Sequence, residues 1–552
     1  MGKSGRKNTG NQILLRPDAN IGNSSAEADD EFLFECFFDH PSLAVLSDMS
    51  SSKLFASGRT GIGKTAILRM IERQNDKVSE VDLTDLALNY VANSDIIRFL
   101  DALDFDLDLF YQALWKHVLC IEFIRLRFNV DNSENSRFAF ARIIDFFSGD
   151  SRRKAALGYL KVWESRFWIT MDENIKEITQ KIESNVDAEL SSEIEKFKGR
   201  AGYARTLSTE KKSSIVDRAK KIVNSDMLTD LAKVLDMLSE YDKSDKYSGN
   251  YFILIDRLDE KWVDERIRFD LIRALIECLR SFRKIRNLKV VVALRSDVLE
   301  RVIQESSHAG FQREKYDDYL LRIRWNKDQL WQLVNKRINY LFRRKYSSDN
   351  VFFYDIFDAK IGSKDTFEYM IERTLLRPRD IISFVNICLS LSQGMQKIPQ
   401  KIVKQAESEY SRIRLQALIE EWESSYPSIR IAFNLMSGRG GRFKPGDISG
   451  KEFIEDFVLE VDDKIGSHSD PIVRHVKEYI KEESSSKLLS TARLLFSTLY
   501  RIGACGLKLA PNEPYLFAFK DVTIVRSDAI NNETKLLVHP MLHRALNISE
   551  NG

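Results

Sequence analysis

The sequence feature that most constrains this chain is an octapeptide with the pattern G-x-x-x-x-G-K-[ST]: Gly58, Arg59, Thr60, Gly61, Ile62, Gly63, Lys64 and Thr65. It follows the apolar segment 53–57 and precedes the helix-like segment 66–73. A glycine-rich turn between a strand and a helix lets successive N–H groups converge on phosphate oxygens, and the helix dipole adds to the attraction. The pattern therefore predicts a phosphate-binding loop, in which Lys64 contacts the β- and γ-phosphates of a nucleotide and Thr65 binds Mg²⁺.

A second motif, Phe252–Glu260, lies far along the chain, with 185 residues between Thr65 and Tyr251. Its four apolar residues, 252–255, predict a buried strand whose carboxyl end places Asp256 beside the phosphate loop. A carboxylate there can bind Mg²⁺, mostly through water. Hydrolysis also needs an acid that polarises the attacking water. Asp259 and Glu260 are both candidates; the motif leaves the choice open, and the longer side chain makes Glu260 the preferred base.

Composition excludes several other classes of protein. Of the 552 residues, 43% are apolar and 30% are charged, as in ordinary globular chains, and the formal net charge is only +2. No run reaches the 18 apolar residues of a membrane-spanning helix, and the polar N-terminus lacks the apolar core of a secretion signal, so we expect no membrane partner. The five cysteines show no CxxC spacing. They predict buried thiols in a reducing cytoplasm, without a zinc site or a disulfide framework.

Strand-like and helix-like segments alternate through the first half of the chain, with strands expected at 53–57, 78–83, 251–255 and 289–294. This alternation predicts an α/β fold with a parallel sheet. The expected domains are a flexible tail (1–28), an α/β core (29–325) with a helical insertion at about 133–248, a helical lid (326–436) and a C-terminal winged-helix-like domain (437–552).

Together these motifs resemble the STAND branch of the AAA+-like P-loop ATPases over about residues 32–390. The segment Phe252–Glu260 resembles their Walker B motif, 290–297 resembles the strand that ends in the sensor 1 arginine, and 376–380 resembles the lid segment that carries sensor 2. The resemblance implies a catalytic role for Arg295 and nucleotide contacts for Arg377 and Arg379.

The sequence Ile-Asp-Arg-Leu-Asp-Glu is most similar to a poorly characterised group of bacterial P-loop ATPases, from which only ATP binding and hydrolysis carry over. Two features depart from the STAND pattern. Arg257 follows Asp256 where signalling ATPases often have a small residue, and no tandem repeats follow the core.

Other P-loop classes fit less well. The segment Asn326–Gln329 lacks the acid that completes a guanine-recognition [NT]KxD motif, so ATP is expected over GTP. The long separation between the two motifs favours a machine or switch over a small-molecule kinase. The leading hypothesis is a cytoplasmic, Mg²⁺-dependent ATP-driven switch, and the resemblance suggests anti-phage defence or stress signalling, with self-association and a protein effector as partners.

The alternative is a nucleic-acid-directed ATPase similar to replication initiators or loaders. The segment 281–345 carries 16 lysines and arginines against 7 acidic residues, and Arg439 and Arg442 lie in a glycine-rich stretch. Under this alternative, these charges form a DNA- or RNA-binding surface whose affinity for nucleic acid would fall with salt. An inactive scaffold is the least favoured hypothesis because Lys64, Asp256 and Glu260 are all present.

Overall fold

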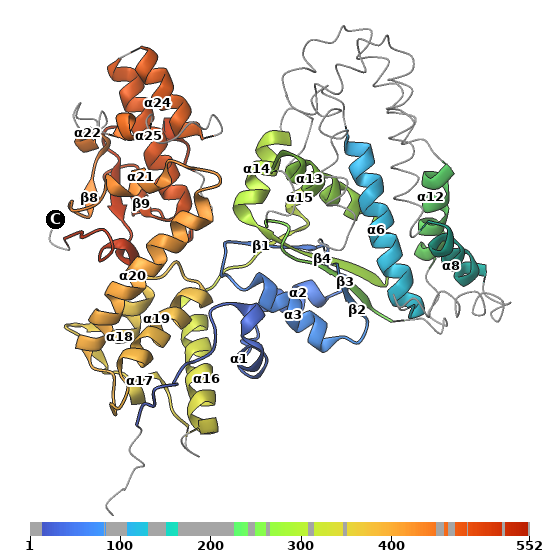
Figure 1. Cartoon of the computed structure of the whole chain (residues 1–552), viewed down its shortest axis with the longest axis horizontal. Coiled ribbons are helices and arrows are strands. Elements are labelled where there is room, and N and C mark those ends of the chain that lie inside the picture. The colour runs from blue at the N-terminus through green and yellow to red at the C-terminus, as the bar shows by residue number, and fades with distance from the viewer. Residues whose placement is uncertain are drawn as a thin grey trace, which may run out of the picture. The chain divides into compact units, whose positions relative to one another are not determined.

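A computed structural model of the chain is shown in Figure 1. It describes residues 14–81, 83, 107–130, 151–163, 226–240, 249–260, 265–306, 314–345, 350–448, 457–461, 470–482, 484–520 and 525–549. The chain forms two compact units. We call Asp39–Arg59 with Lys64–Ile323 the sheet unit, and Met1–Phe38, Thr60–Gly63 and Arg324–Gly552 the helical unit. Most of the insertion expected at about 133–248 lies outside the described residues.

The sheet unit is built on a five-stranded parallel sheet with the strand order β2-β3-β4-β1-β5. The strands are β1 (Phe55–Gly58), β2 (Val78–Glu80), β3 (Tyr251–Ile255), β4 (Leu288–Arg295) and β5 (Leu320–Arg322). β4 lies between β1 and β3, and its register pairs Gly58 with Arg295. The carboxyl ends of β1, β3 and β4 therefore lie at one edge of the sheet, which is where ligands bind in open α/β folds.

Helices cover both faces of this sheet. Figure 1 shows α2 and α3 on one face and α6 and α13 on the other. The described helices of the unit are α2 (Pro41–Ser47), α3 (Lys64–Gln74), α6 (Asp108–Phe128), α8 (Ser151–Trp163), α12 (Asp226–Ser239), α13 (Glu265–Phe282), α14 (Ser296–Ser306) and α15 (Glu314–Asp317). All five residues of β3 are buried, as expected for a central strand covered on both sides. Its alternate residues Tyr251, Ile253 and Ile255 join the hydrophobic core formed with α6 and α13.

The helical unit contains two small antiparallel sheets among its helices. One sheet pairs β6 (Lys360–Ile361) with β7 (Lys364–Asp365), and the other has the order β8-β10-β9. The remaining elements are η1 (Ala26–Ala28), α1 (Asp30–Glu35), α16 (Lys327–Lys345), α17 (Phe353–Ile356), α18 (Thr366–Ile371), α19 (Pro378–Leu391), α20 (Gln400–Trp422), α21 (Ile429–Asn434), β8 (Arg442–Phe443), α22 (Pro445–Ile448), α24 (Pro471–Lys481), α25 (Ser485–Ile502), β9 (Cys505–Lys508), η4 (Ser527–Ala529), β10 (Lys535–Val538) and η5 (Pro540–Leu542).

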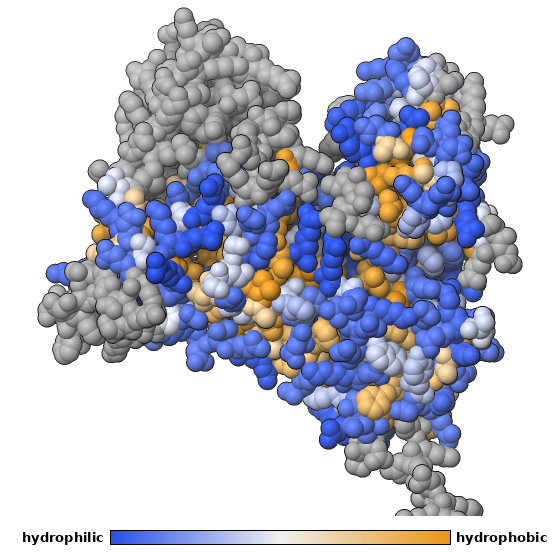
Figure 2. Space-filling view, turned by 180° about the vertical axis from the view of Figure 1, so that it is seen from behind, coloured by the Kyte–Doolittle hydropathy of each residue, from blue (hydrophilic) through white to orange (hydrophobic). Residues whose placement is uncertain are grey.

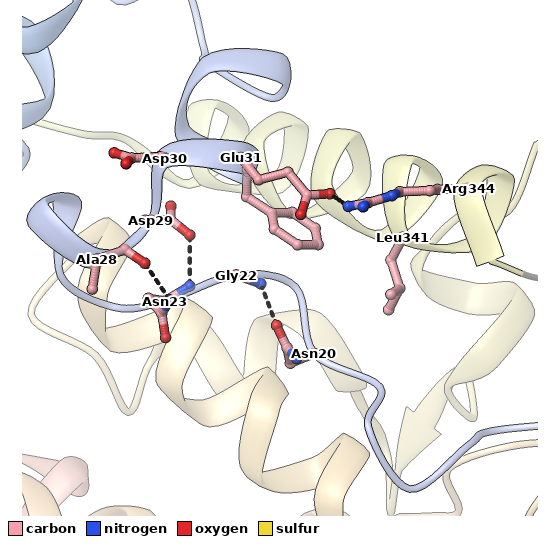
Figure 3. Close-up of a pocket in the computed structure, with 10 residues that line it drawn as sticks. Asn20, Gly22, Asn23, Ala28, Asp29, Asp30, Glu31, Leu341 and Arg344 are labelled. Atoms are coloured by element: carbon pink, nitrogen blue, oxygen red, sulfur yellow. Dashed lines mark hydrogen bonds and ion pairs between the residues drawn. The ribbon is translucent and has the colours of Figure 1, made fainter.

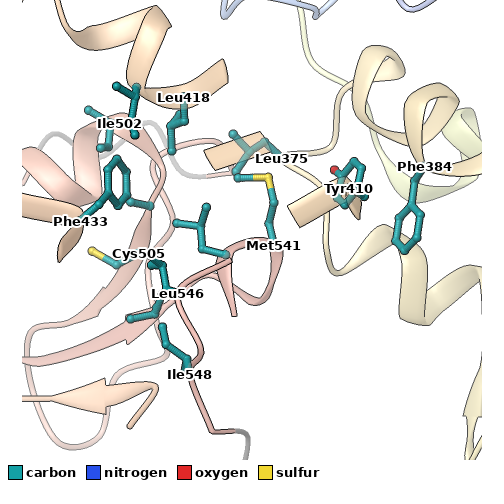
Figure 4. Close-up of a cluster of buried hydrophobic side chains, with 14 of the residues drawn as sticks. Leu375, Phe384, Tyr410, Leu418, Phe433, Ile502, Cys505, Met541, Leu546 and Ile548 are labelled. Atoms are coloured by element: carbon teal, nitrogen blue, oxygen red, sulfur yellow. The ribbon is translucent and has the colours of Figure 1, made fainter. Parts of the chain in front are cut away.

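The expected lid and C-terminal domain share one hydrophobic core. Figure 4 shows Tyr410 of α20 in the same cluster as Met541 of η5. Between them, the Ser411 hydroxyl donates to the Met541 carbonyl over 2.6 Å and accepts from the Ala545 N–H over 3.0 Å. The segments on either side of residue 437 therefore pack as one body, and the sequence division at that residue marks no separate core.

Residues 14–28, which the sequence assigns to a flexible tail, instead contribute to this core. Leu15 and Ile21 are fully buried, and Leu15 exchanges backbone hydrogen bonds with the turn at Gly394–Met395. Their side chains pack on the helical unit because isolated apolar residues in a polar segment still gain free energy from burial.

The five cysteines are free and buried, which confirms the expected burial of their thiols. Across the part of the chain that the structure describes, no helix has the length and apolar character needed to cross a bilayer.

Candidate nucleotide-binding site

The phosphate loop joins β1 to α3, as the pattern predicts. β1 ends at Gly58, and α3 begins at Lys64. Gly61 and Gly63 have φ angles of +77° and +100°, a backbone conformation that side chains disfavour. A Cβ atom at Gly61 would also lie 2.8 Å from the side chain of Arg379, so glycine is required there for space as well as for conformation.

Lys64 lies folded over its own loop. Its Nζ donates to the carbonyl oxygens of Gly58 and Arg59, each over 3.2 Å. This places the ammonium group inside the turn, where it is available to exchange carbonyl partners for the oxygens of a phosphate.

Thr65 and Asp256 meet at the base of the loop, although 190 residues separate them. The Thr65 hydroxyl donates to Asp256 Oδ2 over 2.7 Å, and the second oxygen of Asp256 accepts the Arg257 N–H over 2.8 Å. Burial raises the pKa of Asp256, while the bonds from Thr65 and Arg257 and the charge of Lys64 act against that rise. A hydroxyl and a carboxylate oxygen so close together are hard ligands that fit Mg²⁺, which takes few protein ligands and keeps several waters.

The loop after Asp256 separates the two candidate bases. Arg257 has a φ of +61°, an uncommon left-handed conformation for a residue other than glycine. Beyond this turn, Asp259 lies 3.6 Å from Arg295 with its side chain 24% exposed. Glu260 is 65% exposed and faces Arg257 at 3.9 Å. Asp259, the less exposed of the two acids and the one beside Arg295, therefore lies on the site side of the loop.

Arg295 ends β4 as the sequence predicts, and its guanidinium faces acids. Its Nε and Nη2 donate to the two oxygens of Asp297 over 3.0 and 2.8 Å. Since Asp259 Oδ2 also lies 3.6 Å from its Nε, Arg295 joins the acids that follow β3 and β4 into one cluster at the carboxyl edge of the sheet.

Arg268 is a site residue that sequence reasoning missed. It lies on α13, is 7% exposed, and its Nη1 donates to the backbone carbonyls of Asp259 and Glu260, each over 3.1 Å. Both carbonyls of the acidic turn are therefore fixed by one side chain. No motif marks Arg268, because the contact depends on how α13 packs beside the turn.

Arg377 is buried in a network of charges in the helical unit. Its guanidinium donates to Asp380 over 3.0 Å, to the Thr60 carbonyl over 2.9 Å and to Glu421 over 3.4 Å. Arg414 donates to the other oxygen of Asp380 over 3.1 Å. Burial disfavours the charged form of Arg377, but the negative charges of Asp380 and Glu421 raise the pKa of this arginine.

Arg379 lies over the loop. Its backbone N–H donates to the Gly61 carbonyl and its Nε to the Ser24 carbonyl. Burial, together with the charges of Arg377 and Arg414, lowers its pKa. Nucleotide contact by Arg377 and Arg379 stays a prediction, and the two residues are seen here holding the backbone of the loop.

A pocket of about 340 Å³ lies near the start of the helical unit (Figure 3). Asn20, Asp29, Glu31 and Arg344 are among the residues that line it. Its polar groups are paired with one another: Asp29 accepts the Asn23 N–H, and Glu31 forms an ion pair with Arg344. Asp29 is also bound to the buried Arg337 over 2.6 Å.

The basic residues expected to form a nucleic-acid surface differ in their surroundings. Lys289 is buried in β4, where its Nζ donates to the carbonyls of Val45, Asp48 and Ser51. Arg439 and Arg442 are both exposed. Of these two residues of the glycine-rich stretch, Arg442 lies in strand β8. The face in Figure 2 is mostly hydrophilic, with hydrophobic residues in smaller groups among the described ones.

Comparisons with known proteins add three likenesses. The family described as "FunZ-associated C-terminal helical domain" matches residues 328–419, which run from α16 into α20. A "Putative transposon gamma-delta 80.3 kDa protein" of Escherichia coli K12 is 21% identical over 308 residues, covering 54% of this chain and 40% of the relative. The chain thus spans less than half the length of that relative.

Among solved structures, a Walker-type ATPase of Pyrococcus abyssi is 12% identical to this chain, with a TM-score of 0.32. The match covers 86% of this chain and 98% of the other. So low a score adds nothing to the assignment of the fold. That assignment depends on the parallel sheet and the strand–loop–helix described above, which are consistent with a P-loop NTPase.

Proposed function

We propose that this chain is a Mg²⁺-dependent ATPase of the P-loop class that works as a nucleotide-driven switch. The observation that carries the proposal is the 2.7 Å contact between Thr65, at the end of an intact phosphate loop, and Asp256, at the end of a strand distant in sequence. Two separate motifs thus supply one oxygen pair of the kind that holds Mg²⁺ beside nucleotide phosphates.

Within this proposal each residue has a defined task. The loop N–H groups and Lys64 bind the phosphates, and Thr65 with Asp256 would hold Mg²⁺, which neutralises phosphate charge when bound. Asp259 lies on the site side of the acidic turn, so we propose it as the base that orients the attacking water, although the sequence favours Glu260. Arg295, which pairs with Asp259 and Asp297, is proposed to compensate negative charge that develops in the transition state.

The decisive test is Lys64→Ala. Loss of the ammonium leaves phosphate charge uncompensated, so tight Mg-ATP binding should be abolished in a calorimetric titration of the folded variant. Lys53→Ala is the matched control, since Lys53 lies just before β1 and its Nζ donates to the Asp317 carbonyl. Unchanged Mg-ATP affinity of Lys64→Ala would contradict the assignment. GTP titrated in parallel tests the expected preference for ATP.

The biological setting is a further part of the proposal. The STAND resemblance, with its Ile-Asp-Arg-Leu-Asp-Glu version of the Walker B motif, supports a cytoplasmic switch in anti-phage defence or stress signalling that self-associates and engages an effector protein. Light scattering of the purified chain with and without Mg-ATP tests self-association. A mass that is the same in both states would remove nucleotide-dependent assembly from the proposal.

A second candidate is an ATPase directed by nucleic acid. Two observations favour it. The Escherichia coli relative is named for a transposon. Arg439 and Arg442 are exposed just before and at the start of β8, in the three-stranded antiparallel sheet that we propose as part of a winged-helix-like domain. Arg439→Ser with Arg442→Ser should then weaken DNA or RNA binding in fluorescence anisotropy, more at low salt than at high salt. No binding by the wild type at low salt would exclude this candidate.

A further inference from the structure

Three consecutive peptide groups of the phosphate loop are held by hydrogen bonds inside the helical unit. Arg377 Nη1 donates to the Thr60 carbonyl over 2.9 Å, and the Arg379 N–H donates to the Gly61 carbonyl over 3.4 Å. The indole Nε1 of Trp325 donates to the Ile62 carbonyl over 2.8 Å. Each of these bonds reaches the loop from a residue at least 260 positions later in the chain.

The geometry of the peptide bond turns these contacts into a constraint on phosphate binding. In a planar trans peptide, the carbonyl oxygen of one residue and the N–H of the next point in opposite directions. Holding the carbonyls of residues 60, 61 and 62 therefore fixes the directions of the N–H groups of residues 61, 62 and 63. Those N–H groups are the ones that a phosphate loop uses to bind its anion.

The groups that hold the carbonyls are themselves fixed. Trp325 lies directly before α16, and its ring packs against Phe38 with centroids 5.4 Å apart. Arg377 is clamped by Asp380 and Glu421 at the start of α19. Since glycines 61 and 63 give the loop backbone unusual freedom, contacts of this kind are what can hold it in one conformation before a nucleotide binds.

We infer that Trp325 and Arg377 are positioning residues that orient the phosphate-binding N–H groups of the loop through its carbonyls. Arg377 then acts on the nucleotide through the Thr60 peptide, and the segment 325–380 responds to the occupied loop through the same bonds. This inference depends on the proposed nucleotide binding. It adds to that proposal the residues that set the affinity for the nucleotide and the part of the helical unit that responds when the nucleotide binds.

The test uses Trp325→Phe, which keeps an aromatic ring and removes only the indole N–H. We expect the Kd for Mg-ATP of the full chain to rise about fivefold, the effect of losing one hydrogen bond, with little change in melting temperature. Trp422→Phe is the matched control, because Trp422 is a buried tryptophan of the same unit whose Nε1 has no hydrogen-bond partner in the described structure. That variant should keep the wild-type Kd.

Arg377→Lys is a second test of the positioning role, and Arg373→Lys is its control. Both arginines are buried in the helical unit and paired with acids, Arg377 with Asp380 and Arg373 with Glu407 over 2.6 Å. Arg377→Lys keeps a cation for Asp380 and should raise the Kd for Mg-ATP, whereas Arg373→Lys should not.

The outcomes separate this inference from the proposed function. A wild-type Kd in both Trp325→Phe and Arg377→Lys, or a fall in melting temperature without a change in Kd, overturns the positioning role and leaves the ATPase intact. Equal losses of affinity in the variants and their controls also overturn it. Absence of Mg-ATP binding by the wild type overturns the proposed function and this inference together.

Discussion

Two buried aspartates, one in each unit, have opposite electrostatic surroundings. Asp380 of the helical unit is fully buried between Arg377 and Arg414, and despite the burial these two cations lower its pKa. Asp256 of the sheet unit is 9% exposed and bound by the Thr65 hydroxyl and a backbone N–H, and burial raises its pKa. Two arginines offset the charge of Asp380, whereas the bonds from Thr65 and Arg257 and the charge of Lys64 offset only part of the cost of burying the Asp256 charge.

From this difference we predict that Asp380 supports the fold and that Asp256 supports chemistry. A carboxylate paired with two arginines stabilises the structure as long as all three charges remain. A buried carboxylate whose pKa is raised destabilises the folded state at neutral pH, and such groups are common at functional sites. The comparison can be tested with the same substitution at both positions.

The largest effect should come from Asp380→Asn. The amide leaves Arg377 and Arg414 buried without their shared counter-charge, so the free energy of unfolding should fall by about 3–5 kcal/mol. Urea unfolding of the full chain measures it. Asp470→Asn is the control, because Asp470 is equally buried but accepts from the backbone N–H groups of Ser428 and Ile472. A loss no larger in Asp380→Asn than in this control would show that the arginines contribute little.

Asp256→Asn should give the contrasting result. Removing a buried charge without an arginine partner should leave the unfolding midpoint unchanged or slightly raised, while hydrolysis of ATP is lost because the Mg²⁺ ligand is weakened. Single-turnover hydrolysis over a range of Mg²⁺ concentrations, with urea unfolding on the same samples, measures both. A destabilisation like that of Asp380→Asn would remove the distinction between the two sites.

The next effect in size concerns the acidic turn. Asp259→Asn should slow single-turnover hydrolysis at least about 100-fold while ATP binding persists, because an amide cannot accept a proton from water. Glu260→Gln should have a small effect, since that side chain faces outward toward Arg257. If instead Glu260→Gln abolishes turnover and Asp259→Asn does not, the base is Glu260, as the sequence favours.

Acid should then weaken both units through a buried histidine in each. Burial lowers the pKa of His117 in the sheet unit and of His539 in the helical unit to about 3. In the unfolded chain these histidines take up a proton near pH 6.5. The free energy of unfolding therefore has its full value above that pH and falls as the pH drops toward 3, by up to about 1.4 kcal/mol per pH unit for each histidine. Urea unfolding between pH 7 and 5 tests this, and His539→Gln should flatten the slope. An unchanged slope in that variant would show that His539 does not contribute.

The sheet unit was more predictable from sequence than the helical unit, and the reason is burial. The strand expected at 251–255 is β3 residue for residue, because a central parallel strand is covered on both faces and reads as an unbroken apolar run. In the helical unit, β9 follows the end of α25 at Gly503 without such a run and was missed. Leu516, in a short apolar segment of the same region, forms a single isolated bridge with Leu507.

The residues of the candidate site also differ in whether the sequence reveals them. The residues of the phosphate loop and Asp256 are marked by contiguous motifs, because phosphate and Mg²⁺ binding require those residue types in that order. Arg268 and Trp325 bind backbone carbonyls, which every residue has, so no pattern around either of them reveals the contact. Such residues can be identified only from the folded structure, in which packing brings them next to the site.

The smallest predicted effect concerns Arg268, the residue of this kind in the sheet unit. Arg268→Met removes the donor to the Asp259 and Glu260 carbonyls, so the acidic turn loses its fixed position, and kcat for ATP should fall about tenfold while KM stays close to the wild-type value. Arg268→Lys, which can still reach a carbonyl, should recover part of the rate. Arg273→Met is the control on the same helix, since Arg273 pairs with Asp108 and Asp270. If Arg273→Met lowers kcat as much as Arg268→Met does, the loss reflects damage to α13, and Arg268 has no particular role in placing the acids.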